Sequence, residues 1–192
     1  HSFPTRRSSD LPLEVVRNPT SVNFLHKLFN CCFKSGKSPE IWQQGIINPI
    51  PKSGSVDNRI PLNTRGITLA PVVAKLYTSV LNARIVQWAE LNDLIVDEQN
   101  GFRGNRSCPD HILMLTNIIE TRKKKGKSTF AGFVDFRKAY DRIDRSLMWH
   151  KLMAYGVQGN MLNALKSLYT NVTTCVRLNG LYSDWFNVNC GL

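Results

Sequence analysis

The stretch that most constrains this chain is residues 128–144, which changes character halfway along. Its first part, 129–134, is apolar, partly aromatic and preceded by a run of lysines, a pattern typical of a buried β-strand. An acid, Asp135, follows directly. A buried unpaired carboxylate is costly, and strand ends that face a cleft are where metal-binding acids are found. The pattern therefore predicts a strand that delivers Asp135 to a functional site; the alternative is that Asp135 caps a helix predicted over 136–144.

The nine residues 133–141, FVDFRKAYD, extend this observation. They resemble motif A of the reverse transcriptase palm in non-LTR (LINE-type) retrotransposons, in which an aromatic, any residue, Asp, three residues, Ala, an aromatic and Asp follow one another. The resemblance implies that Asp135 is catalytic and holds a metal ion together with the backbone carbonyl of Phe136. It also implies that Tyr140 lies under the nucleotide sugar. Without the resemblance, Tyr140 would equally suit a core aromatic.

A β-hairpin is predicted between 45–52 and 59–69, because two extended runs flank turn residues at 53–58. Lys52 falls near the end of one arm and Arg65 on the other. An arginine offers a planar fork and a lysine a point charge, so the pair suits a phosphate chain. The alternative is that both cations are solvated hairpin surface.

Two short segments of this hairpin resemble the fingers motifs of the same family: 49–54, which reads P-x-x-K-x-G, and 63–69, which reads N-x-R-G-I-x-L. The resemblance implies that Lys52 and Arg65 bind the triphosphate of the incoming nucleotide. Thr64 departs from the family pattern, which usually has an aromatic at this place.

A polar, glycine-punctuated loop over 97–107 resembles the family's Q-x-G-F-R segment. We expect its arginines, Arg103 and Arg106, either to contact template phosphates or to pair with acids, with equal weight on each. Ser107 is expected to cap the helix that follows.

Hydrophobic periodicity and turn residues predict the remaining elements. The Asn179-Gly180 pair is a strong hairpin signal. The adjacent cysteines Cys31 and Cys32 suit neither a zinc site nor a disulfide framework and are expected to be buried thiols. Helices are predicted from 19–21 to 35–39, over 71–91, over 147–155 and over 160–169. A further helix is predicted after Ser107, with a buried face formed by Ile112, Leu115, Ile118 and Ile119. The strands predicted around Asn179-Gly180 are 173–180 and 181–186.

The charge balance favours a polyanionic partner. The chain has 25 Lys and Arg against 14 Asp and Glu, a formal net charge of +11, and nucleic acid is the commonest partner of so basic a domain. We expect residues 1–11 to be a translated sequencing adapter rather than native protein. They hold two arginines and one aspartate, so leaving them out lowers the net charge by one. No apolar run is long enough to span a bilayer.

The resemblance implies an α+β fold, the fingers and partial palm of a right-hand polymerase, with an antiparallel sheet packed against helices. We expect a fingers-like region over 12–127 and a partial palm with motif A over 128–192. The family's motifs B and C do not occur before the sequence ends at Leu192. The chain is therefore expected to be an N-terminal fragment of the family's domain.

The implied reaction is RNA-directed DNA synthesis. Its partners would be an RNA template, a DNA primer and a dNTP, and its cofactor two Mg²⁺ ions held by carboxylates. One aspartate cannot hold both ions, so we expect residues 1–192 alone to be inactive. Asp141 and Asp144 are expected to be surface or structural acids. Two alternatives stay open: a non-catalytic nucleic-acid-binding domain on the same scaffold, and a fragment that does not fold alone because apolar faces and sheet edges lie uncovered.

Overall fold

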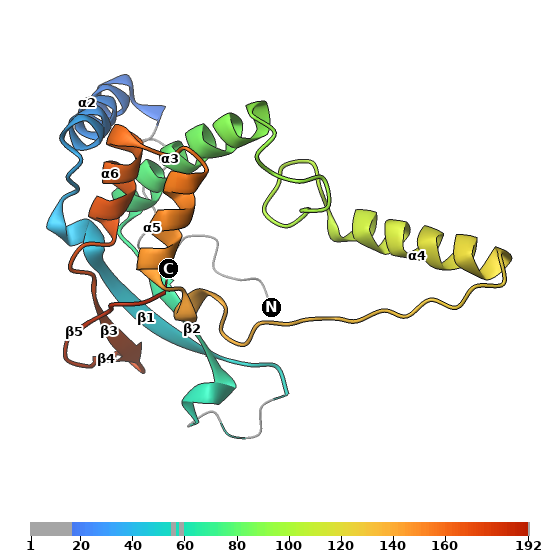
Figure 1. The fold of residues 1–192 in the computed structure, drawn as a ribbon. Coiled ribbons are helices and arrows are strands. Elements are labelled where there is room, and N and C mark those ends of the chain that lie inside the picture. Colours follow the sequence, from blue (N-terminus) through green and yellow to red (C-terminus); the bar gives the residue numbers. More distant parts are fainter. Residues whose placement is uncertain (1–16, 55–56, 58–59, 192) are drawn as a thin grey trace. The chain divides into compact units, whose positions relative to one another are not determined.

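The computed structural model describes residues 17–54, 57 and 60–191, so the segment 1–11 lies outside the described residues. The chain divides into two compact units (Figure 1). Unit 1 holds the chain up to Arg84 and from Tyr140 onward, and unit 2 is Ile85–Ala139.

Unit 1 is built on a five-stranded sheet. β1 pairs with β2 in antiparallel register, whereas β1 and β3 are parallel. β3 pairs in antiparallel fashion with both β4 and β5. The strands are β1 (Gln44–Pro51), β2 (Thr64–Leu69), β3 (Thr173–Leu178), β4 (Leu181–Tyr182) and β5 (Phe186–Asn187).

The combination of helices and a sheet is confirmed, but the expectation of a purely antiparallel sheet is wrong. Parallel neighbours need a crossover connection of a dozen or more residues. The chain between β1 and β3 provides one, because it includes several helices. Local patterns cannot reveal this pairing, since the two strands are about 120 residues apart in sequence.

The hairpin predicted at Asn179-Gly180 is confirmed. Leu178 pairs with Leu181, and both turn residues have positive φ, 50° for Asn179 and 82° for Gly180. Two positive φ values are what a type I′ turn requires. The second arm is shorter than predicted: β4 ends at Tyr182, and β5 returns to pair with the beginning of β3.

In the described part of unit 1, four α-helices accompany the sheet: α2 (Pro19–Ser35), α3 (Val72–Leu91), α5 (Arg145–Ala154) and α6 (Gly159–Leu168). All four were predicted, and α3 continues beyond Arg84 into unit 2. Local signals fix both ends of α2. The Asn18 side chain accepts hydrogen bonds from the amides of Thr20 and Ser21, and Gly36 ends the helix with a φ of 65°.

The core of unit 1 lies among α2, α3, α6 and the short 3-10 turn η1 (Glu40–Gln43). An aromatic group forms its centre: the ring of Tyr77 lies 5.2 Å from that of Phe29 and 5.3 Å from that of Trp42. Burial raises the pKa of Tyr77 to about 12. Tyr77 of α3 thus packs in the core against two other aromatic rings. The buried members of this cluster are Cys32, Trp42, Ala74, Tyr77, Leu81 and Ala164.

Of the adjacent cysteines, Cys32 is buried as expected, whereas Cys31 is exposed and that expectation is wrong. Adjacent helical residues point about 100° apart, so only one of them can face the core.

Unit 2 contains α4 (Cys108–Lys124), whose start is confirmed. Ser107 and Asp110 form a capping box, and hydrogen bonds from Ser107 lower the pKa of Asp110. The predicted burial of one face is wrong. Ile112 is 65% exposed, and its neighbours on that face are exposed too: Leu115, Ile118 and Ile119.

The strand predicted over 129–134 is absent from the described structure of this unit (Figure 1). The chain there is extended but pairs with no described neighbour, and Phe130 is 96% exposed. The helix predicted over 136–144 is also wrong: only a short 3-10 turn, η3 (Tyr140–Arg142), forms within it. A strand requires hydrogen-bonded partners that periodicity alone does not supply.

Within the described residues, no helix has both the length and the apolar character needed to cross a membrane.

Candidate functional site

The predicted basic hairpin is present, and its register brings the two cations together. Arg65 lies opposite Ile50 in the β1–β2 ladder. The amide of Lys52 donates to the carbonyl of Asn63 at 2.9 Å, which continues the pairing by one residue beyond β1. Residues two apart on a strand share a face, so Lys52 lies on the face that Ile50 shares with Arg65. The hairpin therefore presents both cations from one side.

Short-range contacts hold the end of this hairpin. The Lys52 ammonium donates to the carbonyl of Leu62 at 2.7 Å, and the Asn63 side-chain amide donates to the carbonyl of Asp57 at 2.8 Å. An ammonium group carries three donors, so a backbone bond and a phosphate contact are compatible at Lys52. Residues 55–56 and 58 of the turn predicted over 53–58, and residue 59 of the arm predicted over 59–69, lie outside the described residues.

Two prolines are accommodated because this half of β1 has a neighbour on one side only. β3 pairs with β1 at residues 44–47, whereas β2 pairs with it over 46–51. Pro49 and Pro51 thus lie on an edge, where a missing N–H breaks no ladder bond. Gly66 lies opposite Pro49, and the Ile47 side chain packs closely against it. A Cβ on Gly66 would lie 3.1 Å from that side chain.

Asp135 lies in unit 2, within the extended segment that precedes η3. It is exposed, and so are its neighbours Val134 and Phe136, at 84% and 76%. No helix starts beside it, so the capping alternative finds no support among the described residues either. Tyr140 belongs to unit 1 and is 54% exposed. The structure thus joins Lys52 and Arg65 on one hairpin and assigns Asp135 to the other unit.

Asp135 belongs to no cluster of metal-binding side chains in the part of the chain that is described. No group of three or more His, Cys, Asp and Glu residues forms there that would hold a metal ion by itself. The available oxygen ligands in this segment are the Asp135 carboxylate and backbone carbonyls such as that of Phe136. Oxygen donors of this kind are the ligands that Mg²⁺ prefers.

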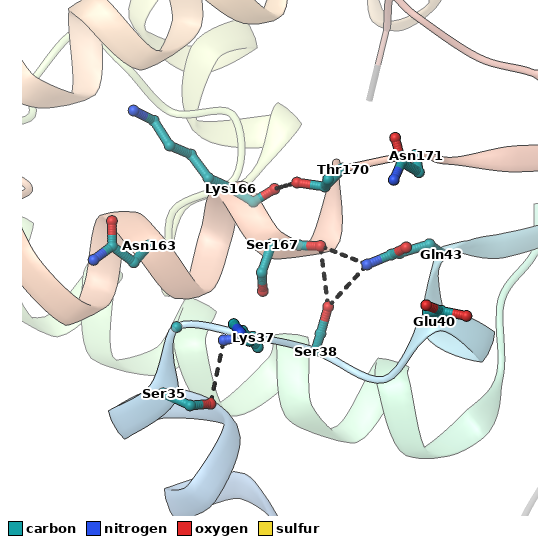
Figure 2. A pocket seen from close by; sticks show the side chains of 11 residues that line it. Ser35, Lys37, Ser38, Glu40, Gln43, Asn163, Lys166, Ser167, Thr170 and Asn171 are labelled. Atoms are coloured by element: carbon teal, nitrogen blue, oxygen red, sulfur yellow. Dashed lines mark hydrogen bonds between the residues drawn. The ribbon is translucent and has the colours of Figure 1, made fainter.

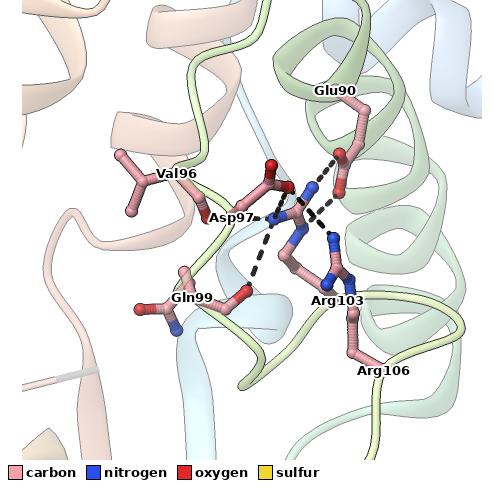
Figure 3. A network of polar contacts seen from close by, with 6 residues as sticks. All are labelled: Glu90, Val96, Asp97, Gln99, Arg103 and Arg106. Carbon is pink, nitrogen blue, oxygen red and sulfur yellow. Dashed lines mark hydrogen bonds and ion pairs between the residues drawn. The ribbon is translucent and has the colours of Figure 1, made fainter. Parts of the chain in front are cut away.

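Arg103 is engaged inside unit 2 (Figure 3). Its Nε and a terminal nitrogen donate to the two Glu90 oxygens at 2.9 and 2.6 Å, and its other terminal nitrogen donates to the Val96 carbonyl at 3.0 Å. The hydrogen bond from Arg103 lowers the pKa of Glu90, and the same bond raises the pKa of Arg103. This geometry ties the loop to the end of α3, as the pairing alternative predicts.

Arg106 is held more loosely. One terminal nitrogen donates to the Asp97 carboxylate at 3.1 Å, and the Asp97 side chain is 90% exposed (Figure 3). The Arg106 side chain is 36% exposed, against 11% for Arg103. Sequence reasoning did not identify Glu90 as the partner of Arg103, because an acid on the preceding helix carries no local signal of that contact.

Arg145, which sequence reasoning missed, organises the last part of unit 1. It donates to the carbonyls of Gly191 and Val188 at 2.9 and 2.8 Å, and its guanidinium lies 5.1 Å from the centre of the Tyr169 ring. The preceding residue, Asp144, accepts from the amides of Ser146 and Leu147 and caps α5, so its predicted structural role is confirmed. Nothing in the sequence around Arg145 indicates the distant carbonyls it binds.

The chain was compared with known proteins. Residues 50–192 match the family described as reverse transcriptase (RNA-dependent DNA polymerase), a range that includes the hairpin cations and Asp135. The Xenopus laevis "Transposon TX1 uncharacterized 149 kDa protein" is 23% identical over 154 residues, 80% of this chain and 12% of that protein. The Drosophila melanogaster "Probable RNA-directed DNA polymerase from transposon X-element" is 25% identical over 176 residues, 90% of this chain and 19% of the relative.

A further relative is the Popillia japonica "Retrovirus-related Pol polyprotein from type-1 retrotransposable element R2". It is 27% identical over 143 residues, 74% of this chain and 19% of that polyprotein. The chain thus spans less than a fifth of the length of each of these three relatives.

Proposed function

The chain belongs to the reverse transcriptase (RNA-dependent DNA polymerase) family, and we propose that it supplies the nucleotide-binding hairpin and one metal-binding carboxylate of an RNA-directed DNA polymerase. The observation that carries the proposal is the hairpin register, which presents Lys52 and Arg65 from one face. In this proposal the partners are an RNA template, a DNA primer and a dNTP. Residues 12–127 form a fingers-like region of a right-hand polymerase, and 128–192 form part of its palm.

The hairpin acts on the triphosphate of the incoming nucleotide. Arg65 offers a planar fork that binds two phosphate oxygens at once, whereas Lys52 offers a compact charge with rotatable donors. The bond from the Lys52 ammonium to Leu62 fixes the direction of that side chain, and a group with three donors can contact phosphate at the same time. Holding the phosphates at two points orients the α-phosphate for attack by the primer's hydroxyl group.

Asp135 would hold Mg²⁺ through its carboxylate, with the Phe136 carbonyl as a further ligand. When bound, two such ions lower the pKa of the attacking hydroxyl and stabilise charge on the leaving pyrophosphate. Asp135 would supply a carboxylate oxygen and Phe136 a backbone carbonyl oxygen to the Mg²⁺ site, and phosphate oxygens of the nucleotide are ligands of the same kind. Tyr140, five residues on, would contact the nucleotide sugar, and its half-exposed ring is accessible for that contact.

The loop arginines divide their roles. The Arg103 guanidinium is already hydrogen-bonded to Glu90 and to the backbone, which supports a role for Arg103 in positioning the loop. Arg106 has one bond to an exposed carboxylate and is the better candidate for a template phosphate. A carboxylate that is itself exposed competes weakly with an incoming phosphate, since exposed ion pairs contribute little.

Nucleotide binding by residues 1–192 tests the proposal. A fluorescent dNTP is titrated into the chain and into Arg65→Gln and Lys52→Gln. Each change should weaken binding roughly ten- to a hundredfold, because a charge-assisted hydrogen bond contributes roughly 1.5–3 kcal/mol. Lys27→Gln and Lys75→Gln remove the same charge from exposed positions on α2 and α3 and serve as controls. Equal losses in all four variants would show that general charge, and not the hairpin, attracts the nucleotide.

A further inference from the structure

Arg145, the first residue of α5, connects two parts of unit 1 that are distant in sequence. Its Nε donates to the Gly191 carbonyl at 2.9 Å. One terminal nitrogen is shared between the carbonyls of Val188, at 2.8 Å, and Tyr169, at 3.3 Å. A planar guanidinium with five donors holds several acceptors in one arrangement, which a flexible ammonium group does not. Arg145 therefore joins residues 188–191, here called the anchored segment, to the end of α6.

The end of α6 is itself held in place. Figure 2 shows the Ser167 carbonyl accepting from the Ser38 hydroxyl at 3.0 Å and from the Gln43 amide at 2.9 Å, which joins the last turn of α6 to the residues that lead into β1. The anchored segment has a second attachment, because the Val188 amide donates to the Val172 carbonyl at 2.9 Å, directly before β3. The support to which Arg145 connects is thus part of the ordered core and sheet of unit 1.

The anchored segment packs directly against η3, the turn that begins at Tyr140. The Gly191 amide donates to the Ile143 carbonyl at 2.8 Å, and the Cys190 thiol donates to the Asp141 carbonyl at 3.6 Å. Gly191 is buried and has a φ of 79°, and a Cβ on it would lie 3.0 Å from the carbonyl oxygens of both Tyr140 and Asp141. A glycine is therefore required for this approach of the two backbones.

The residues before η3 give its backbone less support. The stretch 129–134 pairs with no described neighbour, and Tyr140 is the first residue of unit 1 after it. The Tyr140 ring is 54% exposed, so packing around it restricts its direction less than it would for a buried ring. The direction of the ring therefore depends on how firmly the η3 backbone is held, and the anchored segment supplies long-range contacts that hold it.

We propose that Arg145 is a positioning residue: through the anchored segment it fixes the η3 backbone and with it the direction of the Tyr140 ring. The consequence for nucleotides rests on the proposed function, in which this ring contacts the nucleotide sugar. Without the Arg145 guanidinium, the anchored segment loses its connection to α6 and η3 loses the surface against which it packs. The chain then discriminates less between nucleotides that differ by a 2′-hydroxyl, while the hairpin still binds the triphosphate.

Fluorine NMR of the chain labelled with 3-fluorotyrosine tests the position of the ring. The chain has five tyrosines, and the Tyr140 signal is identified by its disappearance in Tyr140→Phe. Arg145→Gln and Gly191→Ala should each move the Tyr140 signal toward its frequency in the denatured chain, because the first removes the anchor and the second forces η3 away from the segment. The signal of Tyr77, which lies in the core, should stay in place and shows that the chain is folded.

Lys151→Gln is the matched control, because it removes a positive charge from the same helix, where Lys151 lies over the Tyr155 ring. It should shift the Tyr155 signal and leave the Tyr140 signal in place. If Arg145→Gln does not fold, Arg145→Lys replaces it, since a lysine keeps the charge but loses the planar fork. An unmoved Tyr140 signal in the folded Arg145 variant or in Gly191→Ala overturns the proposal.

The affinity for dATP divided by that for ATP measures the consequence for nucleotides. The unaltered chain should prefer dATP by about tenfold or more, because rejection of one added group in a shaped site is worth roughly that much. Tyr140→Ala should abolish this preference. Arg145→Gln should reduce it by about half or more, because a displacement of roughly 1 Å removes much of the effect of a positioned group. Lys151→Gln should leave the preference as it is in the unaltered chain.

The two proposals fail in different ways. A preference that is lost in Tyr140→Ala but unchanged in Arg145→Gln overturns the positioning role and leaves the proposed function standing. An equal reduction in Lys151→Gln also overturns the positioning role, because general charge would then explain the effect. A preference that is unchanged in Tyr140→Ala removes the sugar contact from the proposed function, and the fluorine signal of Tyr140 then decides the positioning role by itself.

Discussion

The two units of this chain are held together by different kinds of contact. Unit 1 has a sheet with helices around a closed core, in which Tyr77 and Leu81 are 2% and 1% exposed. Unit 2 has an amphipathic helix whose apolar face is exposed, and its described buried residues are Ala89 and Asn100. Its best-defined feature is a polar cluster around Arg103. An apolar face stabilises a fold only where a partner covers it, and unit 2 by itself offers none to α4 among its described residues.

This difference bears on function. The hairpin cations lie in the unit with a core, so their relative placement is fixed by strand pairing. Asp135 lies in the unit without one, on a segment that has no paired neighbours among the described residues. A catalytic group must be held within a fraction of an ångström, which requires packing around it. The nucleotide-binding part of the proposed site is therefore the better organised part of this chain.

The largest predicted effect is a difference between two leucine-to-alanine substitutions, one in the core of unit 1 and one on the exposed face of α4. The first should lower the free energy of unfolding much more than the second. Leu81→Ala, at a 1% exposed position, should lower the free energy of unfolding by about 2–5 kcal/mol because it leaves a cavity in the core. Leu113→Ala, on α4 at a 61% exposed position, should change it by less than about 0.5 kcal/mol. Urea unfolding followed by intrinsic tryptophan fluorescence measures both, since tryptophans lie in both units. A cost at Leu113 as large as that at Leu81 would mean that the α4 face is covered in solution.

A second, smaller contrast concerns glycine. A Cβ at Gly45 in β1 would lie 2.7 Å from the Thr68 side chain and 3.3 Å from that of Thr174. Gly45→Ala should therefore cost about 1–3 kcal/mol through overpacking. At Gly132, in the extended segment of unit 2, an added Cβ would meet no atom within 4 Å, so Gly132→Ala should be neutral or slightly stabilising. Urea unfolding measures both substitutions. A loss of stability in Gly132→Ala would show that the extended segment is packed against other residues.

The smallest effect tests the polar order of unit 2. Because the hydrogen bond from Arg103 lowers the pKa of Glu90, the ion pair contributes fully above the ordinary glutamate value of 4.5 and is lost as the pH falls through the lowered value. A carbon-13 NMR titration of the Glu90 carboxyl should show this lowered pKa. Arg103→Gln should return it toward the ordinary value, and Arg106→Gln should move it less. An unchanged titration in Arg103→Gln would show that the pair does not form in solution.

Whether a feature could be predicted from the sequence depends on how far apart in the chain the residues that determine it lie. The hairpin with Lys52 and Arg65 was predicted because both strands and the turn lie within about 25 residues. Helix α4 began where Ser107 indicated, since a capping box is a contact between neighbours. The contacts of Arg103 with Glu90 and of Arg145 with Gly191 were not predicted. Each needs a particular approach of two separate segments, and neither partner carries a mark of the other in its own neighbourhood.

By itself, the sequence determined where α2 starts and stops, where α4 starts, where the chain reverses at Asn179-Gly180, and which residues face the same side of the basic hairpin. These follow from backbone preferences and hydrogen bonds within a few residues. Tertiary structure alone decided that β1 and β3 run parallel and that 129–134 forms no strand. Burial and strand pairing depend on which surfaces meet, and a periodic pattern specifies an apolar face without specifying what covers it.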